Sequence, residues 1–211
     1  FSHRPDLVTP VPPDVASLAV RASSAPSLAR AIDALNAWQY QVLEACAIAP
    51  EPFTEKAIAA LTDKAALFVF PGLLERGLIF QGKDGYYLPT TVREVLGNEI
   101  QGLGPQTVVK LNLKKLDEAP PAAKKALEAM VWGPPRGTVA DVKKPGAGVA
   151  WLLENNFVVA ANTKTVLLVR EVALALRGGK LHKELQIQAP ALKTEKRDLK
   201  SVQLAAIANI T

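Results

Sequence analysis

The chain has 211 residues, of which 49% are hydrophobic, and it carries a formal net charge of +5. This length is enough for a sizeable core in one or two domains. The apolar runs are too short for a membrane span, and the single cysteine, Cys46, excludes an internal disulfide framework and a cysteine-based zinc site. Cys46 is predicted to be a buried structural thiol, and this cysteine usage suits a reducing cytoplasm.

The charge is distributed unevenly along the chain. Residues 1–100 carry 8 Lys and Arg against 11 Asp and Glu. Residues 101–176 carry 10 against 6, and residues 177–211 carry 7 against 3. The first half is therefore expected to repel a phosphate backbone, whereas the rest of the chain attracts one.

Residues 1–26 predict a loop, a short helix and a turn, and a first domain is predicted at 27–100. Apolar spacing in this domain predicts successive helices, two of them capped by Asn36 and Thr54. A further helix runs through "FPGLLE", where Pro71 predicts a kink or a late start. The stretch "LIFQGKDGYYL" then predicts a hairpin around a Gly/Asp turn.

Residues 101–120 predict a connector that could hold one strand, and a second domain follows at 121–180. Its two apolar helices are predicted in "AAKKALEAMV" and "GVAWLLE". Between them, "GPPRGTVADVKKPG" is too short and too rich in Pro and Gly for a full helix. The hairpin "FVVAANTKTVLLV" and the helix "REVALALRGG" complete the domain, with Gly178 and Gly179 as a left-handed C-cap.

Residues 181–211 predict an exposed linker and the start of a helix capped by Asp198. The chain stops without a helix stop signal, and it begins without Met or a signal-peptide layout. We therefore expect a fragment of a longer protein.

An internal repeat connects the two predicted domains. "VLEACA" is answered by "ALEAMV", "LLERGLIF" by "LLENNFVV", and "VREV" by a second "VREV", in the same order along the chain. Each copy ends in an apolar helix followed by a hairpin, which is the pattern of a winged-helix domain. The sequence thus predicts a mainly α fold with small β-hairpins (α+β), arranged as tandem winged-helix domains.

No catalytic constellation is found in the sequence. His3 and His182 stand in loop-like flanks, without carboxylate or cysteine partners at ligand spacing, and are expected to be exposed. "RGGKL" lacks the remaining residues of a phosphate-binding loop. We therefore expect no enzyme activity, no cofactor and no metal.

Nucleic-acid binding is the remaining function that the residues indicate. The third helix of the second domain carries no Arg, Asn or Gln near its start, so contact with phosphates is expected rather than base reading. The basic residues expected to make such contacts are Arg136, Lys143, Lys144, Lys164, Arg177, Lys180, Lys193, Lys196 and Arg197.

The segments "RPDLVTPVPPDVASLAVRASSAPSLARAIDALNAWQYQVLEA", "WGPPRG" and "LLVREVALALRGG" resemble the N-terminal region of actinobacterial helicase-associated proteins. These proteins carry a domain related to the N-terminal region of XPB-type DNA helicases. The resemblance implies a bacterial cytoplasmic protein, with nucleoid association as a further option, that acts in DNA repair or transcription. It implies no catalytic residue for this stretch, and the helicase motor motifs are missing from the sequence.

Two functions stay open at this point. The first is a DNA-binding module with little sequence preference. The alternative is a protein-interaction scaffold that docks a helicase or the rest of its own chain. No membrane partner is expected, because the apolar runs are short. No small-molecule substrate is expected either, and a ligand-sensing regulator would need an effector site, of which the sequence shows none.

Overall fold

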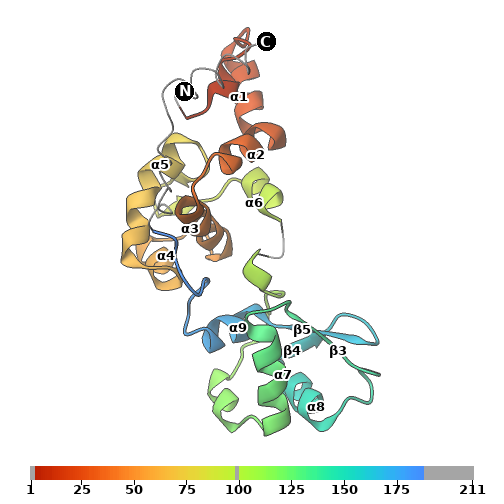
Figure 1. Ribbon diagram of the computed structural model, residues 1–211. Coiled ribbons are helices and arrows are strands. Elements are labelled where there is room, and N and C mark those ends of the chain that lie inside the picture. The colour runs from red at the N-terminus through yellow and green to blue at the C-terminus, as the bar shows by residue number, and fades with distance from the viewer. Residues whose placement is uncertain (1–2, 98–99, 188–211) are drawn as a thin grey trace, which may run out of the picture.

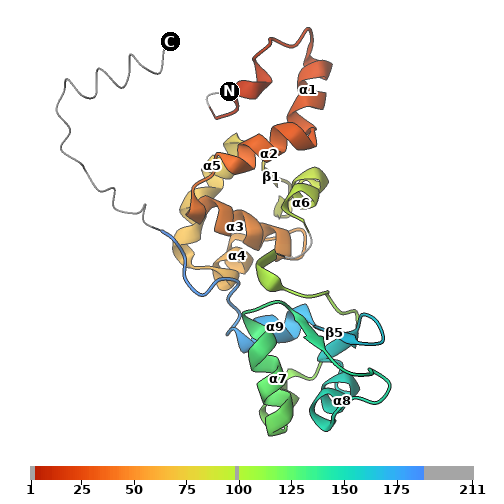
Figure 2. The same ribbon diagram turned by 45° about the vertical axis from the view of Figure 1, so that its right-hand side comes forward.

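In the computed structural model, which describes residues 3–97 and 100–187, the chain forms two halves joined by a narrow connection (Figure 1). Helices α1 to α6 and a short hairpin make the first half. Helices α7 to α9 and a three-stranded sheet make the second, and both views show the two halves stacked end to end (Figure 2). The α+β prediction is confirmed. None of the described helices has the length and apolar character needed to cross a bilayer.

The first half runs through these elements: η1 (Pro5–Leu7), α1 (Val15–Ser23), α2 (Ala25–Asp33), α3 (Ala37–Ile48), α4 (Glu55–Leu61), η2 (Lys64–Val69), α5 (Phe70–Glu75), β1 (Phe80–Gln81), β2 (Tyr86–Tyr87) and α6 (Thr90–Leu96). The connection and the second half contain η3 (Ile100–Gly102), η4 (Leu113–Glu118), α7 (Pro121–Val131), β3 (Arg136–Thr138), α8 (Ala147–Glu154), β4 (Val158–Ala160), β5 (Thr165–Leu168) and α9 (Arg170–Leu176).

Local signals in the sequence determine where several helices begin and end. Asn36 and Gln39 form a reciprocal capping box at the start of α3, with bonds of 2.8 and 3.1 Å. Thr54 caps α4 through the backbone N–H of Ala57. Pro71 lies in the first turn of α5, and the 3-10 helix η2 precedes it, so the predicted late start is confirmed.

The second half contains a strand where the sequence predicted only an irregular segment. β3 pairs antiparallel with β5, β5 pairs antiparallel with β4, and the sheet order is β3-β5-β4. The Pro- and Gly-rich residues around β3 prevent a helix, as expected, but they leave three residues free to pair. The strand considered for residues 101–120 is not found in the described part of that connector, which holds 3-10 turns instead.

A similar order of elements recurs in both halves, except that α4 of the first half has no counterpart in the second. In the first half, α3 is followed by Phe53, which bridges Tyr86 on the second hairpin strand. In the second half, α7 is followed by β3, which pairs with the second hairpin strand β5. A helix (α5 or α8), a hairpin (β1-β2 or β4-β5) and a last helix (α6 or α9) then follow. The repeated sequence segments therefore occupy equivalent places in the two halves.

The two halves share one contiguous apolar cluster, to which Ile100, Leu103 and Leu181 from the connecting segments also belong. Residues 181–187 were expected to be an exposed linker; this is wrong for Leu181 and His182, which are buried, whereas Lys183, Glu184, Gln186 and Ile187 are exposed. Leu181 is fully buried, and its backbone N–H donates to the carbonyl of Leu61 at 2.9 Å. Gln41 on α3 extends the contact, because its side chain bonds the backbone of Glu184 and Gln186. The chain thus returns from α9 to pack along the first half (Figure 1).

Buried polar groups lie at this junction. The Glu44 carboxylate accepts two bonds of 3.0 Å from Gln101 Nε2 and lies 3.4 Å from Nε2 of His182. His182 is 8% exposed, so the expectation that it is an exposed bystander is wrong. The sequence could not show this, because the residues that bury His182 come from α3, far along the chain. His3 is exposed, as predicted, and lies 3.2 Å from Glu75.

Burial shifts the pKa of both junction groups. It lowers the pKa of His182 below its ordinary 6.5; the hydrogen bond with Gln41 opposes this shift, and the charge of Arg177 adds to it. Burial raises the pKa of the Glu44 carboxyl, against the bonds from Gln101. Burial also raises the pKa of the Cys46 thiol, which is fully enclosed, so the predicted structural thiol is confirmed.

A pH-dependent contribution to stability follows from His182. Because its folded-state pKa lies below 6.5, its contribution is complete above that pH and is lost as the pH falls through the folded pKa. We expect the difference in unfolding free energy between the wild type and His182→Gln to shrink as the pH is lowered from neutral to about 5. Urea denaturation at a series of pH values measures it. A difference that stays constant or grows on acidification would contradict this prediction.

Candidate nucleic-acid interface

One end of the three-stranded sheet carries most of the predicted phosphate-binding side chains in the described residues. The loop after β3 lies against the turn of the β4-β5 hairpin. Val139 N–H donates to the carbonyl of Lys164 at 2.9 Å, and Val142 N–H donates to that of Thr163 at 2.8 Å. These two bonds bring Lys143 and Lys144 beside Lys164, although the segments are about twenty residues apart in the sequence.

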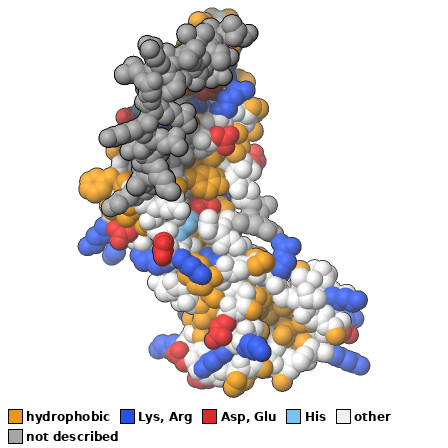
Figure 3. All heavy atoms as spheres, viewed as in Figure 1, with side chains coloured by type: hydrophobic (Ala, Val, Ile, Leu, Met, Phe, Trp, Pro, Cys, Tyr) orange, Lys and Arg blue, Asp and Glu red, His pale blue; other side chains and the backbone are white. Residues whose placement is uncertain are grey.

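Side-chain hydrogen bonds hold the backbone turns at this end of the sheet. The Asp141 carboxylate accepts from the backbone N–H of Lys143 at 2.9 Å, and the Asn162 side chain accepts from that of Lys164 at 2.8 Å. Such turns fix the backbone and leave the lysine side chains, all three of which are exposed, pointing away from the core. We call Lys143, Lys144 and Lys164 the lysine cluster. Figure 3 shows blue side chains along the hairpin side of the second half.

Arg136 lies at the start of β3, on the strand that leads into the same loop. Gly137, its neighbour, faces Met130 and Val166 in the core, so Arg136 and Thr138 lie on the outer face of the sheet. Arg136 is exposed and has an interaction of its own within the protein. It pairs with Leu167, so it lies on the same sheet as the lysine cluster but at the end of β3 away from the hairpin turn.

Helix α8, the third-helix position of the second half, contributes no base-reading side chain. Its sequence is AGVAWLLE, and its charged residue is the exposed Glu154. Gly148 lies so close to α7 that an added Cβ would sit 2.8 Å from the carbonyl carbon of Ala122. Asn155 caps the helix through Trp151 O, and Asn156 follows with φ of 57°. Both asparagines therefore end the helix, as predicted.

Arg177 is not available to nucleic acid, which corrects its place among the predicted residues. It is 6% exposed. Its guanidinium donates to the carbonyls of Val131, Leu181 and Gln101 at 2.7, 3.3 and 3.0 Å. It also lies 4.5 Å from the Trp132 ring centroid. Arg177 is a structural residue of the junction.

Lys180 is exposed and has a bond within the protein. Its ammonium donates to the carbonyl of Thr62 at 2.6 Å, so it links the end of the second half to α4 of the first. Lys193, Lys196 and Arg197 lie outside the described residues. Four of the nine predicted residues thus gather at the sheet, and two others take part in the junction.

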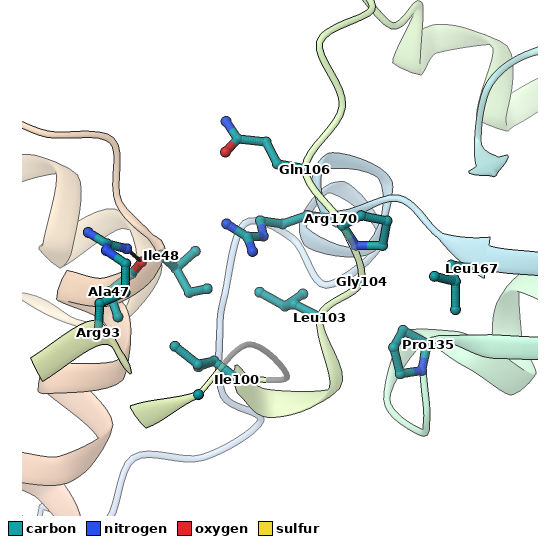
Figure 4. A pocket seen from close by; sticks show the side chains of 12 residues that line it. Ala47, Ile48, Arg93, Ile100, Leu103, Gly104, Gln106, Pro135, Leu167 and Arg170 are labelled. Atoms are coloured by element: carbon teal, nitrogen blue, oxygen red, sulfur yellow. Dashed lines mark hydrogen bonds between the residues drawn. The ribbon is translucent and has the colours of Figure 1, made fainter. Parts of the chain in front are cut away.

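The sequence missed a second group of residues, in a cleft between the halves (Figure 4). Arg93 and Arg170, the arginines of the two "VREV" segments, both line it. The repeat could have drawn attention to this pair, but no local pattern shows that both arginines face the same cavity. No group of acidic, histidine or cysteine side chains suited to a metal ion occurs among the residues described. Comparisons with protein-family models, curated proteins and solved structures gave no match to this chain.

Proposed function

We propose that this chain is a non-catalytic module of two tandem winged-helix domains that binds duplex DNA with little sequence preference. The lysine cluster is the surface that holds the DNA backbone. The observation that carries this proposal is the pair of backbone bonds between the loop after β3 and the β4-β5 turn, because they gather three exposed lysines at the tip of the hairpin. Lysines so placed suit phosphates, which supply most of the affinity in non-specific DNA binding.

The order of elements supports the domain type. Each half has a helix, a residue or strand that pairs with the hairpin, a helix directly before the hairpin, and the hairpin itself. This resembles the arrangement that places one helix and one wing against a duplex, although the second half has no counterpart of α4. The apolar surface of α8 and its Glu154 argue against base reading in the major groove. We therefore assign the contact to the hairpin and its neighbouring loop.

A salt titration tests the lysine cluster. In the variant Lys143→Gln/Lys144→Gln/Lys164→Gln, fluorescence anisotropy with a labelled duplex should show weaker binding. Each phosphate contact contributes about 0.9 to the slope of log K against log salt, so the slope should become smaller by about 2 to 3. The matched control is Lys114→Gln/Lys124→Gln/Lys125→Gln, which removes the same charge from η4 and α7, away from the hairpin.

Comparison of the two variants shows whether DNA affinity depends on where the lysines lie or only on the total charge. If the control variant loses as much affinity as the cluster variant, only the total charge matters and the assigned surface is wrong. Wild-type binding that does not respond to salt would contradict the DNA proposal itself.

A protein-interaction scaffold is the second candidate function. A hollow of about 250 Å³ between η4, α7 and α9 is lined by Leu116, Leu127, Val131 and Leu176. Leu176 and nearby Trp132 are more than one-third exposed, so apolar surface is open to a partner. Such a partner would be a helicase or further residues of the same protein. The resemblance to helicase-associated proteins suits both candidates and suggests a role in DNA repair or transcription in the bacterial cytoplasm.

A further inference from the structure

The cleft between the halves has a volume of about 460 Å³, which lies in the usual range for small-molecule sites. Its lining comes from α3, α6, the connection after η3, β5 and α9. In Figure 4 the side chains of Ile48, Ile100 and Leu103 point toward one another, and the guanidinium of Arg170 reaches over them from α9. A molecule in this cleft would therefore contact both halves of the protein.

Arg170 is half-buried, and within residues 3–97 and 100–187 its guanidinium has no hydrogen-bond or salt-bridge partner. Its Nε is buried. Other arginines with a buried Nε are satisfied elsewhere: Arg4 bonds Arg76 O and Ser27, and Arg76 bonds Gly72 O. A half-buried guanidinium without a partner is costly, and an anionic ligand would offset that cost.

Arg93 lines the wall of the cleft opposite Arg170 (Figure 4). Its guanidinium is fixed on the far wall by the carbonyl of Ala47 and by Glu51, at 2.8 Å from the carboxylate. Burial lowers the pKa of Arg170, the Glu171 carboxylate opposes this shift, and the Arg93 charge adds to it. The Glu171 carboxylate itself accepts from the backbone N–H of Thr107 at 3.3 Å. Arg170 thus remains the group that is open to a ligand.

The rest of the cleft combines apolar side chains with polar groups, and its Ile100, Leu103 and Pro135 are largely buried. Ile48, Ile100, Leu103, Pro105, Pro135 and Leu167 form its walls, and Gln106 adds one amide at the rim. Free phosphate would use only the arginine side. An anion carried on an apolar or aromatic body would use both the cation and these walls.

We propose that this cleft binds a small organic anion, a phosphate or carboxylate carried on an apolar body, with Arg170 as its anchoring residue. The site is separate from the lysine cluster and does not depend on the DNA proposal. Because its walls belong to both halves, the ligand would stabilise their present arrangement. It would be the effector site that the sequence did not show.

NMR titration with phenyl phosphate tests the site directly, with the Arg170 Nε–H resonance as the reporter. The wild type should show a saturable shift of this resonance and should bind phenyl phosphate more tightly than inorganic phosphate. Arg170→Gln should lose affinity by about 10- to 100-fold, the range for a charge-assisted bond. Arg170→Lys keeps the charge but not the planar fork and should bind with intermediate affinity. The control Arg30→Gln removes an exposed arginine of α2 and should bind like the wild type.

Each outcome decides for or against the site. Loss of phenyl phosphate in a folded Arg170→Gln variant, with unchanged DNA affinity in the anisotropy assay, supports it. Loss of both ligands would overturn it, because the cleft would then hold a DNA phosphate. It would also be overturned by equal binding of phenyl phosphate and inorganic phosphate, by equal weakening in Arg30→Gln, or by the absence of any Arg170 shift in the wild type. The DNA proposal fails separately, in the lysine cluster variants.

Discussion

Gly104→Ala is expected to lower the unfolding free energy by about 3 kcal/mol, since it places a side chain where another backbone already lies. A Cβ at Gly104 would be 1.9 Å from the carbonyl oxygen of Leu168. That oxygen belongs to β5, whose pairing with β4 through Val158 leaves it little freedom to move. The neighbouring bond from Arg170 N–H to the carbonyl of Pro105, at 2.9 Å, holds the connection against β5. The substitution must therefore separate the connection from the sheet.

Gly146→Ala is the matched control, because a Cβ there meets no atom within 4 Å. Urea denaturation of both variants measures the difference, and Gly146→Ala should stay close to the wild type. If the two variants had equal stability, the close contact between the connection and β5 would not exist in solution.

Arg177→Ala is expected to cost a similar amount, about 3 kcal/mol, because it leaves buried carbonyl groups without donors. Those carbonyls belong to Val131, Leu181 and Gln101, which come from three separate segments of the junction. Arg177→Lys should recover little of the loss, since a single ammonium does not reproduce the spread of the guanidinium. The Trp132 ring would also lose its contact with the Arg177 guanidinium, although Lys183 Nζ stays 5.4 Å from its centroid, so its fluorescence should change.

Arg30→Ala serves as the control for this loss, because Arg30 is exposed on α2. Chemical denaturation should place that variant within about 0.5 kcal/mol of the wild type. An Arg177→Ala variant of wild-type stability would mean that Arg177 is free in solution. Arg177 would then again be a candidate for contact with phosphates, as the sequence predicted.

Local features of the fold could be predicted from the sequence, whereas contacts between distant segments could not. Some features follow from residues close together in the chain. These are the capped helix starts at Asn36 and Thr54 and the two left-handed glycines after α9, with φ of 66° and 80°. β3 has only three residues, and its pairing partner β5 lies beyond α8 and β4, so no local period reveals it. Short strands held by distant partners are poorly encoded in local sequence.

Charge alone did not distinguish the basic residues that are exposed at the sheet from those that are buried in the junction. Lys143, Lys144 and Lys164 gather because two loops of one sheet meet, and the predicted hairpin already indicated part of that arrangement. Arg177 carries the same charge but lies where three segments converge, which only the folded chain shows. Arg170 was absent from the predicted set for the converse reason: a single arginine in an amphipathic helix gives no sign of a cleft.

Mapping of a short unlabelled duplex onto the isotope-labelled protein by amide chemical shifts tests the central claim most directly. We predict that the largest perturbations fall in residues 139–144 and 161–165, with α8 and the acidic first half little affected, and that they diminish as salt is raised. Perturbations centred on α8 would indicate base reading by a third helix. The absence of salt-sensitive perturbations around the lysine cluster would contradict the proposal that this module holds DNA.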